Sequence, residues 1–192
     1  MQTTTRQFMS SGLARTLAAL CFLLALASPS WAQKVKLATT MGDIVIELDA
    51  AKAPKTVDNF VQYVKSGHYD GTIFHRVIGN FMIQGGGMTA DMKQKPTRAP
   101  IPLESRNGLT NVRGSVAMAR TNDPNSATAQ FFISVVDNAF LDAANARDGH
   151  GYAVFGKVVS GMDVVDKIRA VPTGPGDVPV QPVTIKSATL EN

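Results

Sequence analysis

Apolar and polar residues alternate near the start of the chain. In the segment 42–49, Ile44, Ile46 and Leu48 fall on one face, and mostly polar residues fall on the other. An apolar period of two is typical of a half-buried strand. The segment 34–39 precedes it, with only Thr40-Met41-Gly42 between. Together the two segments predict a β-hairpin.

In two segments the apolar residues recur every three or four positions, which is typical of amphipathic helices. Pro54 suits a first helical turn, and apolar residues then recur at positions 57, 60, 61 and 64 until Gly67. A shorter helix is predicted to begin with Asp163 as its N-cap and to bury positions 164, 165 and 168. It is expected to stop before Pro172.

Most of the remaining chain is predicted to form short strands separated by turns, over residues 72–78, 81–84, 115–119, 130–136, 152–158 and 183–190. Eight strands with one early and one late helix indicate a mainly β fold, an antiparallel β-barrel with helices covering its ends. Gly85-Gly86-Gly87 is interpreted as a tight turn leaving a strand. Residues 89–111 contain several prolines and charges, and are predicted to form a long surface loop.

The first 32 residues have the layout of a secretory signal peptide. Arg6 and Arg15 precede an apolar run from Leu17 to Ala27, and small residues flank Trp31 at a suitable cleavage site. A membrane anchor is the alternative, but the apolar run of about 11 residues is shorter than the roughly 20 that span a bilayer. We predict a signal peptide over residues 1–32, cleavage after Ala32, and a single domain over residues 33–192.

Composition narrows the classes of function for the mature chain. Loss of Arg6 and Arg15 lowers the formal charge from +4 to +2, and no basic run remains, so no nucleic-acid partner is expected. The only cysteine, Cys21, also leaves, which excludes a disulfide and a thiolate nucleophile. The three histidines lack metal-ligand spacing, and no phosphate-binding loop is present. We therefore expect no metal, no cofactor and no membrane span in the mature chain.

Three segments combine large apolar residues with single hydrogen-bonding side chains. They are Phe74-His75-Arg76-Val77-Ile78-Gly79-Asn80-Phe81-Met82-Ile83-Gln84-Gly85-Gly86, Ala117-Met118-Ala119-Arg120 and Gln130-Phe131-Phe132-Ile133-Ser134. In these segments the chain resembles the cyclophilins, and over the whole mature chain it is most similar to the periplasmic cyclophilins of Gram-negative bacteria. The resemblance implies a closed eight-stranded antiparallel β-barrel capped by two α-helices. It also implies a monomeric peptidyl-prolyl cis-trans isomerase that acts in the periplasm.

The resemblance also assigns site residues. The catalytic positions fall on Arg76, Phe81 and Gln84, and the substrate-binding positions on Met82, Ala119, Arg120, Gln130, Phe132, Phe140, Leu141 and Tyr152. A buried arginine needs a partner. None is evident in the sequence, so Arg76 is expected to face a groove that receives a peptide carbonyl. His75 is expected to be structural and to point away from Arg76. For Phe81, Met82, Phe132 and Leu141 the alternative is an ordinary place in the core.

The predicted function is acceleration of X-Pro bond rotation in unfolded or folding secreted proteins, with proline-containing polypeptides as partners. Phe140 stands where many eukaryotic cyclophilins have tryptophan, and Tyr152 where they have histidine, so weak cyclosporin binding is expected. One alternative is a proline-peptide-binding chaperone of the cell envelope that needs no turnover. Another is a lipocalin-like barrel for an apolar ligand, which bulky inward-facing residues disfavour.

Overall fold

The predicted hairpin is the first element of the fold in the computed structural model, which describes Met1 and residues 33–191. Strand β1 (Lys34–Thr39) pairs antiparallel with β2 (Gly42–Leu48) along its whole length. The alternating residues Ile44, Ile46 and Leu48 are buried, as the pattern predicted. The predicted signal peptide lies outside the described residues, apart from Met1.

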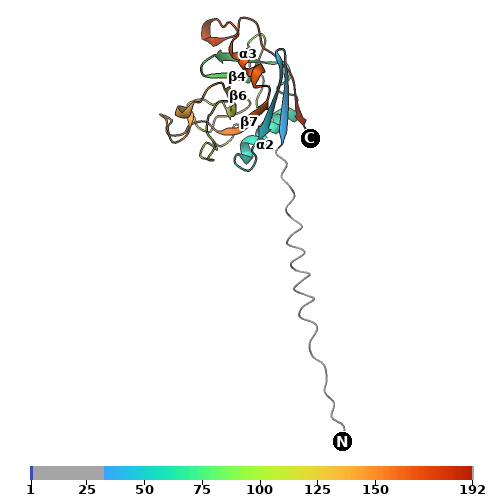
Figure 1. The fold of residues 1–192 in the computed structure, drawn as a ribbon, viewed down its shortest axis with the longest axis vertical. Coiled ribbons are helices and arrows are strands. Elements are labelled where there is room, and N and C mark those ends of the chain that lie inside the picture. The colour runs from blue at the N-terminus through green and yellow to red at the C-terminus, as the bar shows by residue number, and fades with distance from the viewer. Residues whose placement is uncertain (2–32, 192) are drawn as a thin grey trace. The chain divides into compact units, whose positions relative to one another are not determined.

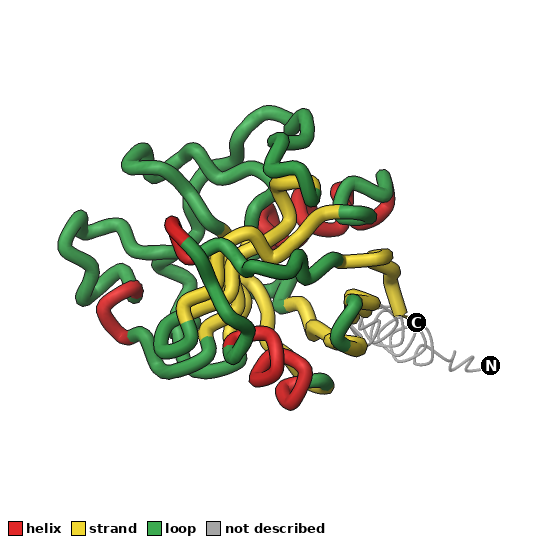
Figure 2. Tube along the Cα trace, turned by 90° about the horizontal axis from the view of Figure 1, so that it is seen from above, coloured by secondary structure: helices red, strands yellow, loops and turns green. Residues whose placement is uncertain are grey.

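Six further strands extend the hairpin into one sheet, namely β3 (Thr72–Ile78), β4 (Met82–Thr89), β5 (Ser115–Met118), β6 (Phe131–Ser134), β7 (Val154–Ser160) and β8 (Ile185–Glu191). The strand order is β3-β4-β6-β5-β7-β2-β1-β8, and each pairing is antiparallel. The strands form one curled sheet (Figure 2), and its two edges come together. There Ile73 bridges Thr184, and the Phe74 N–H donates to the Val183 carbonyl over 2.9 Å. The mainly β, eight-stranded fold is confirmed, with a short closing seam.

Two α-helices pack on this sheet, one near each end of the folded unit (Figure 1). Helix α2 (Pro54–Lys65) has its proline in the first turn, as predicted, and buries Val57, Phe60, Val61 and Val64 in the core. Helix α3 (Met162–Arg169) buries its two valines and Ile168. Two short 3-10 turns, η2 (Ala139–Leu141) and η3 (Pro175–Asp177), lie in the loops beside the strands.

The predicted N-cap of α3 is wrong. The cap is Gly161, with a left-handed φ of 87°, and Asp163 lies in the first turn, where its carboxylate pairs with Lys167 over 3.2 Å. A β-carbon on Gly161 would stand 2.2 Å from the Asp43 carbonyl oxygen. The left-handed conformation and the close contact with Asp43 both require glycine at position 161. Glycine has no side chain, so no side-chain cap forms there.

The glycine run 85–87 is not a tight turn, because it lies inside β4. Gly86 has a φ of 83°, and a β-carbon there would stand within 3.0 Å of both Tyr69 and Phe131. Glycine inside a strand marks a close approach of other groups, and here those groups are aromatic rings.

The predicted loop after β4 is confirmed, since β4 ends at Thr89 and the next strand begins at Ser115.

The barrel interior is filled by side chains. Phe60 is fully buried, and its ring centroid lies 5.0–5.5 Å from those of Tyr69, Phe131 and Phe155. Close aromatic packing of this kind leaves the space occupied, as in small barrels whose inward residues meet at the axis. The packing therefore gives no support to the lipocalin-like alternative.

Candidate active site

The strand register aligns one residue from each of five neighbouring strands. Arg76 on β3 lies opposite Gln84 on β4, which lies opposite Phe132 on β6. Phe132 in turn lies opposite Ala117 on β5, and Ala117 lies opposite Val154 on β7. Directly paired residues share a face of the sheet, so residues up to 78 positions apart form one row.

The apolar part of this row belongs to a hydrophobic cluster separate from the barrel core. Its buried members are Met82, Ala117, Phe132, Leu141 and Val154, and Ile78, Phe81, Leu109, Ala119 and Tyr152 pack against them. Neighbours in the chain such as Ile83, Phe131 and Ile133 point inward to the core instead. Successive strand residues face opposite sides, so the second cluster lies on the outer face. Met82, Phe132 and Leu141 are thus buried, but not in the main core.

Two stacked phenylalanines form one rim of the apolar cluster. The rings of Phe81 and Phe140 lie 5.6 Å apart at 27°, and Phe140 is 58% exposed. Phe81 is held by its backbone, because its carbonyl accepts the Asn138 side-chain amide at 2.9 Å and the Val135 N–H at 3.1 Å. The exposed ring of Phe140 therefore offers apolar surface to a bound molecule.

Tyr152 also packs against the cluster. Its ring meets Phe132 edge-on, with centroids 5.6 Å apart at 79°. Its backbone N–H donates to the Leu141 carbonyl over 2.9 Å. Two predicted binding residues from different segments are thereby tied together beside Phe132.

Arg76 differs from its prediction in one respect. Its side chain is 43% exposed, and its Nε lies 3.4 Å from the carboxylate of Asp177 in η3. It is therefore neither buried nor without a partner. The pair is long and leaves guanidinium hydrogens free, because an arginine carries five N–H donors. Arg76 retains donors for a further acceptor beside the apolar cluster.

Gln84 and Gln130 form a hydrogen-bonded pair next to Arg76. The Gln84 Nε2 donates to the Gln130 Oε1 over 2.9 Å. The Gln130 side chain lies over Gly87, where a β-carbon would approach it to 2.4 Å. The glycine thus makes room for the pair, and the bond orients both amides.

The guanidinium of Arg120 lies against the loop that precedes Tyr152. The side chain is 2% exposed, and it bonds to the Gly151 carbonyl and pairs with Asp148. Its own peptide N–H and C=O form no hydrogen bond with other described residues. The backbone of Arg120 therefore has a free donor and a free acceptor.

His75 does not follow the simple alternation expected of it. The β3–β4 register shifts between Phe74 and Arg76, which breaks the strict in-and-out pattern on which that expectation depended. His75 is buried, and its Nδ1 has no hydrogen-bond partner among the described residues. Burial is the main cause that lowers its pKa, and the positive charge of Arg76 acts in the same direction.

Several residues of this region were not predicted. Ala117 and Val154 complete the row, and the alternation of β5 and β7 could have indicated them. Asp177 had no such signal, because it lies 101 residues from Arg76 in an irregular loop. An open depression beside Glu104, Asn125 and His150 shares no residue with the apolar cluster.

No group of three histidine, cysteine, aspartate or glutamate side chains in residues 33–191 is placed to hold a metal ion. Within the same part of the chain, no helix has the length and apolar character needed to cross a bilayer.

The outer apolar cluster thus lies beside an arginine, two hydrogen-bonded glutamine amides and the aromatic rings of Phe140 and Tyr152. Comparison with known families then identifies the class of the protein. The family described as cyclophilin type peptidyl-prolyl cis-trans isomerase/CLD matches residues 34–190. The chain belongs to this family and is a peptidyl-prolyl cis-trans isomerase.

Individual relatives agree with this assignment. The chain is 63% identical over 161 residues to peptidyl-prolyl cis-trans isomerase cyp18 of Streptomyces antibioticus, covering 81% of this chain and 97% of that protein. It is 53% identical over 186 residues to peptidyl-prolyl cis-trans isomerase A of Dickeya dadantii, covering 92% and 97%. A Cryptosporidium parvum cyclophilin crystallised in the presence of the dipeptide Ala-Pro is 28% identical, with a TM-score of 0.71 over 83% of this chain and 99% of that one.

Proposed function

We propose that the outer apolar cluster binds the proline of an X-Pro segment in exported polypeptides and that Arg76 promotes rotation of the preceding peptide bond. The observation that carries this proposal is the register row, in which Gln84 lies between Arg76 on one neighbouring strand and Phe132 on the other. A relative of the same fold was crystallised with Ala-Pro, which supports a proline-containing ligand.

The reaction needs no nucleophile. Amide rotation has a barrier of about 18–20 kcal/mol, which arises from the partial double bond between carbon and nitrogen. An X-Pro bond left alone isomerises in tens to hundreds of seconds. An enzyme accelerates it by binding the twisted bond more tightly than either planar isomer.

The proposed roles follow from where the side chains lie. Phe81, Met82, Phe132 and Leu141 hold the proline ring, because apolar burial suits a group with no N–H donor. Arg76 donates to the prolyl nitrogen as its lone pair leaves conjugation, or to a neighbouring carbonyl of the peptide.

The polar groups around the pocket would hold the rest of the peptide. Gln84, oriented by Gln130, binds the peptide backbone, and the free N–H and C=O of Arg120 extend that contact. Ala119 would leave room for the chain to pass, and Phe140 and Tyr152, which contact Phe81 and Phe132, would border the bound proline.

We further propose that the chain is processed after Ala32 and acts as a monomer in the periplasm. The apolar run with its basic start supports a signal peptide. The similarity to Dickeya isomerase A also extends over more of the chain than the matched domain does. Mass spectrometry of the protein from the periplasmic fraction should find Gln33 as the first residue. Recovery of the unprocessed chain from the cytoplasm would contradict this part of the proposal.

The direct test of the function is a protease-coupled assay on a tetrapeptide with an Ala-Pro bond. We expect turnover with residues 33–192 alone and no dependence on added metal. Tight binding of the peptide without acceleration of its isomerisation would favour the chaperone alternative.

A further inference from the structure

The loop of residues 142–151 connects two residues of the apolar cluster. Leu141 precedes it and Tyr152 follows it, and the Tyr152 N–H donates to the Leu141 carbonyl over 2.9 Å. Gly151 turns the chain back with a φ of 65°, and a β-carbon there would stand 2.6 Å from the Leu141 oxygen. The position of the Tyr152 ring therefore depends on how this loop is held.

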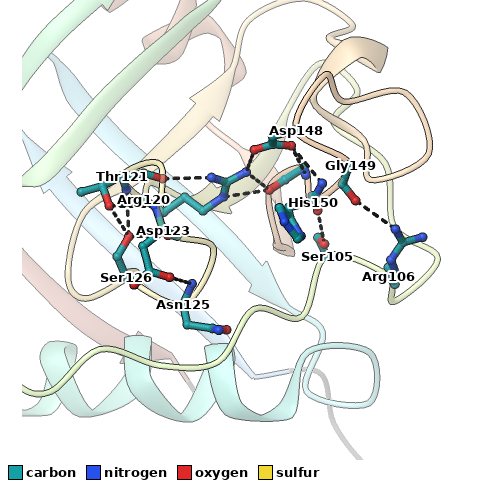
Figure 3. Close-up of polar contacts among 11 residues, drawn as sticks. Ser105, Arg106, Arg120, Thr121, Asp123, Asn125, Ser126, Asp148, Gly149 and His150 are labelled. Atoms are coloured by element: carbon teal, nitrogen blue, oxygen red, sulfur yellow. Dashed lines mark hydrogen bonds and ion pairs between the residues drawn. The ribbon is translucent and has the colours of Figure 1, made fainter.

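The buried guanidinium of Arg120 holds the loop from the end of β5 (Figure 3). Its Nε and Nη2 donate to the Gly151 carbonyl over 3.0 and 2.8 Å, and its Nη2 also pairs with the Asp148 carboxylate. On the other side, Nη1 donates to the Thr121 carbonyl over 2.9 Å. One side chain thus joins two segments that are about thirty residues apart in sequence.

Asp148 is fixed in turn by the loop's own backbone. Its Oδ1 accepts the His150 N–H at 2.9 Å and the Gly151 N–H at 3.1 Å. The hydrogen bond from Arg120, and then those two N–H groups, hold the pKa of Asp148 well below its usual range. The Asp148 carboxylate therefore keeps its negative charge well into the acid range, beside an arginine that is almost fully buried.

The same guanidinium covers the ring of Tyr152. Its central carbon lies 4.5 Å from the ring centroid, within the range of a cation–π contact. The ring also meets Phe132 edge-on. Tyr152 is thus held between the proposed floor of the proline pocket and the Arg120 side chain.

We propose that the Arg120 side chain is a positioning residue for substrate binding: with Asp148 it holds the loop 142–151 and fixes the Tyr152 ring as one wall of the proline pocket. This inference rests on the proposed function of the apolar cluster. It assigns the side chain of Arg120 a role apart from the peptide contacts proposed for its backbone.

The test uses Arg120→Lys, which keeps the charge but loses the planar fork. We expect KM for the Ala-Pro tetrapeptide to rise about tenfold with kcat within about threefold, because a pocket wall contributes to binding of substrate and transition state alike. NMR of the tyrosine rings should show a shifted Tyr152 signal, while the other two tyrosines in the core keep theirs. Asp148→Asn, which can keep the turn through its amide oxygen, should shift KM and the Tyr152 signal in the same direction.

The matched control is Arg106→Lys. Arg106 holds the same loop by donating to the Gly149 carbonyl over 2.9 Å, but it is exposed and does not touch Tyr152. This control should leave KM and the Tyr152 signal unchanged. An equal effect in both arginine variants would overturn the proposal, since it would indicate general loosening of the loop.

A double-mutant cycle separates this inference from the function on which it rests. In a Tyr152→Ala background, Arg120→Lys should change KM by less than about twofold, because its effect passes through the missing ring. A tenfold change in that background as well would refute the inference. If the wild type binds the peptide without turnover, the proposed function fails, and the same cycle measured as peptide Kd by NMR titration still decides the role of Arg120.

Discussion

The Arg76 side chain contacts a residue far along the chain. Its place on β3 could be predicted from the motif, but its pairing with Asp177 could not, because that loop meets β3 only once the fold is complete. Both side chains are more than 40% exposed, and such pairs contribute little stability. We therefore regard the Asp177 contact as orienting Arg76.

Phe140 carries the first prediction, which concerns cyclosporin. The ring is exposed and stacked on Phe81, but phenylalanine lacks the N–H that an indole donates. A missing hydrogen bond costs about 0.5–1.5 kcal/mol, and the smaller ring covers less of the ligand. We expect Phe140→Trp to bind cyclosporin at least about tenfold more tightly than the wild type, measured by calorimetry.

The same variant provides an internal check. Trp31 is the only tryptophan of the chain and lies in the predicted signal peptide. In residues 33–192, Phe140→Trp would be the sole indole, and its emission should change as cyclosporin is added. Equal affinity in the two proteins would mean that Phe140 does not contact the ligand.

The strands themselves were predicted more accurately than the irregularities within them. A period of two identifies the face on which Met82, Gln84 and Phe132 lie, and the register then brings that face together. The shift in β3 near His75 and the glycine run inside β4 could not be predicted. The register shift and the place of the glycine run both depend on contacts between strands. The sequence pattern of a single strand carries no information about such contacts.

Two glycines with a left-handed backbone, one at the start of α3 and one in a loop, allow a test of how α3 begins. Gly161 and Gly149 have φ values of 87° and 69°, but only Gly161 would bring a β-carbon against backbone, while Gly149 has open space. Gly149→Ala should cost about 1–2 kcal/mol, the usual cost of a left-handed conformation. Gly161→Ala should exceed the ~3 kcal/mol that bounds most single substitutions.

Urea denaturation of both glycine variants measures this difference. The expected order is a small shift of the midpoint for Gly149→Ala and a large one for Gly161→Ala. Similar midpoints would show that α3 begins without the close approach to Asp43.

For the whole molecule, the buried histidines predict how stability changes with pH. The pKa values of His68 and His75 are lowered from 6.5, in both chiefly by burial. Below that value the unfolded chain binds protons that the native state does not, so the free energy of unfolding falls as pH falls. At and above neutral pH, this contribution is fully present.

The experiment compares urea midpoints between pH 7.5 and 5. His68→Gln combined with His75→Gln should flatten the decline on acidification, whereas His150→Gln, at an exposed loop position, should leave it unchanged. A decline of the same slope in all three proteins would assign the pH dependence to other groups.

We propose that Arg76, beside the outer apolar cluster, lowers the barrier to rotation of the bound X-Pro bond. The most direct test of this role is kcat/KM for Arg76→Ala, with Arg113→Ala as the control because Arg113 also pairs on the surface, with Asp166 over 2.8 Å. A hydrogen bond from a charged group contributes about 1.5–3 kcal/mol, and each 1.36 kcal/mol is tenfold in rate. We predict a loss of about ten- to a hundredfold for Arg76→Ala with an unchanged far-ultraviolet spectrum, and wild-type efficiency for Arg113→Ala. Wild-type efficiency in Arg76→Ala would show that Arg76 does not promote the rotation.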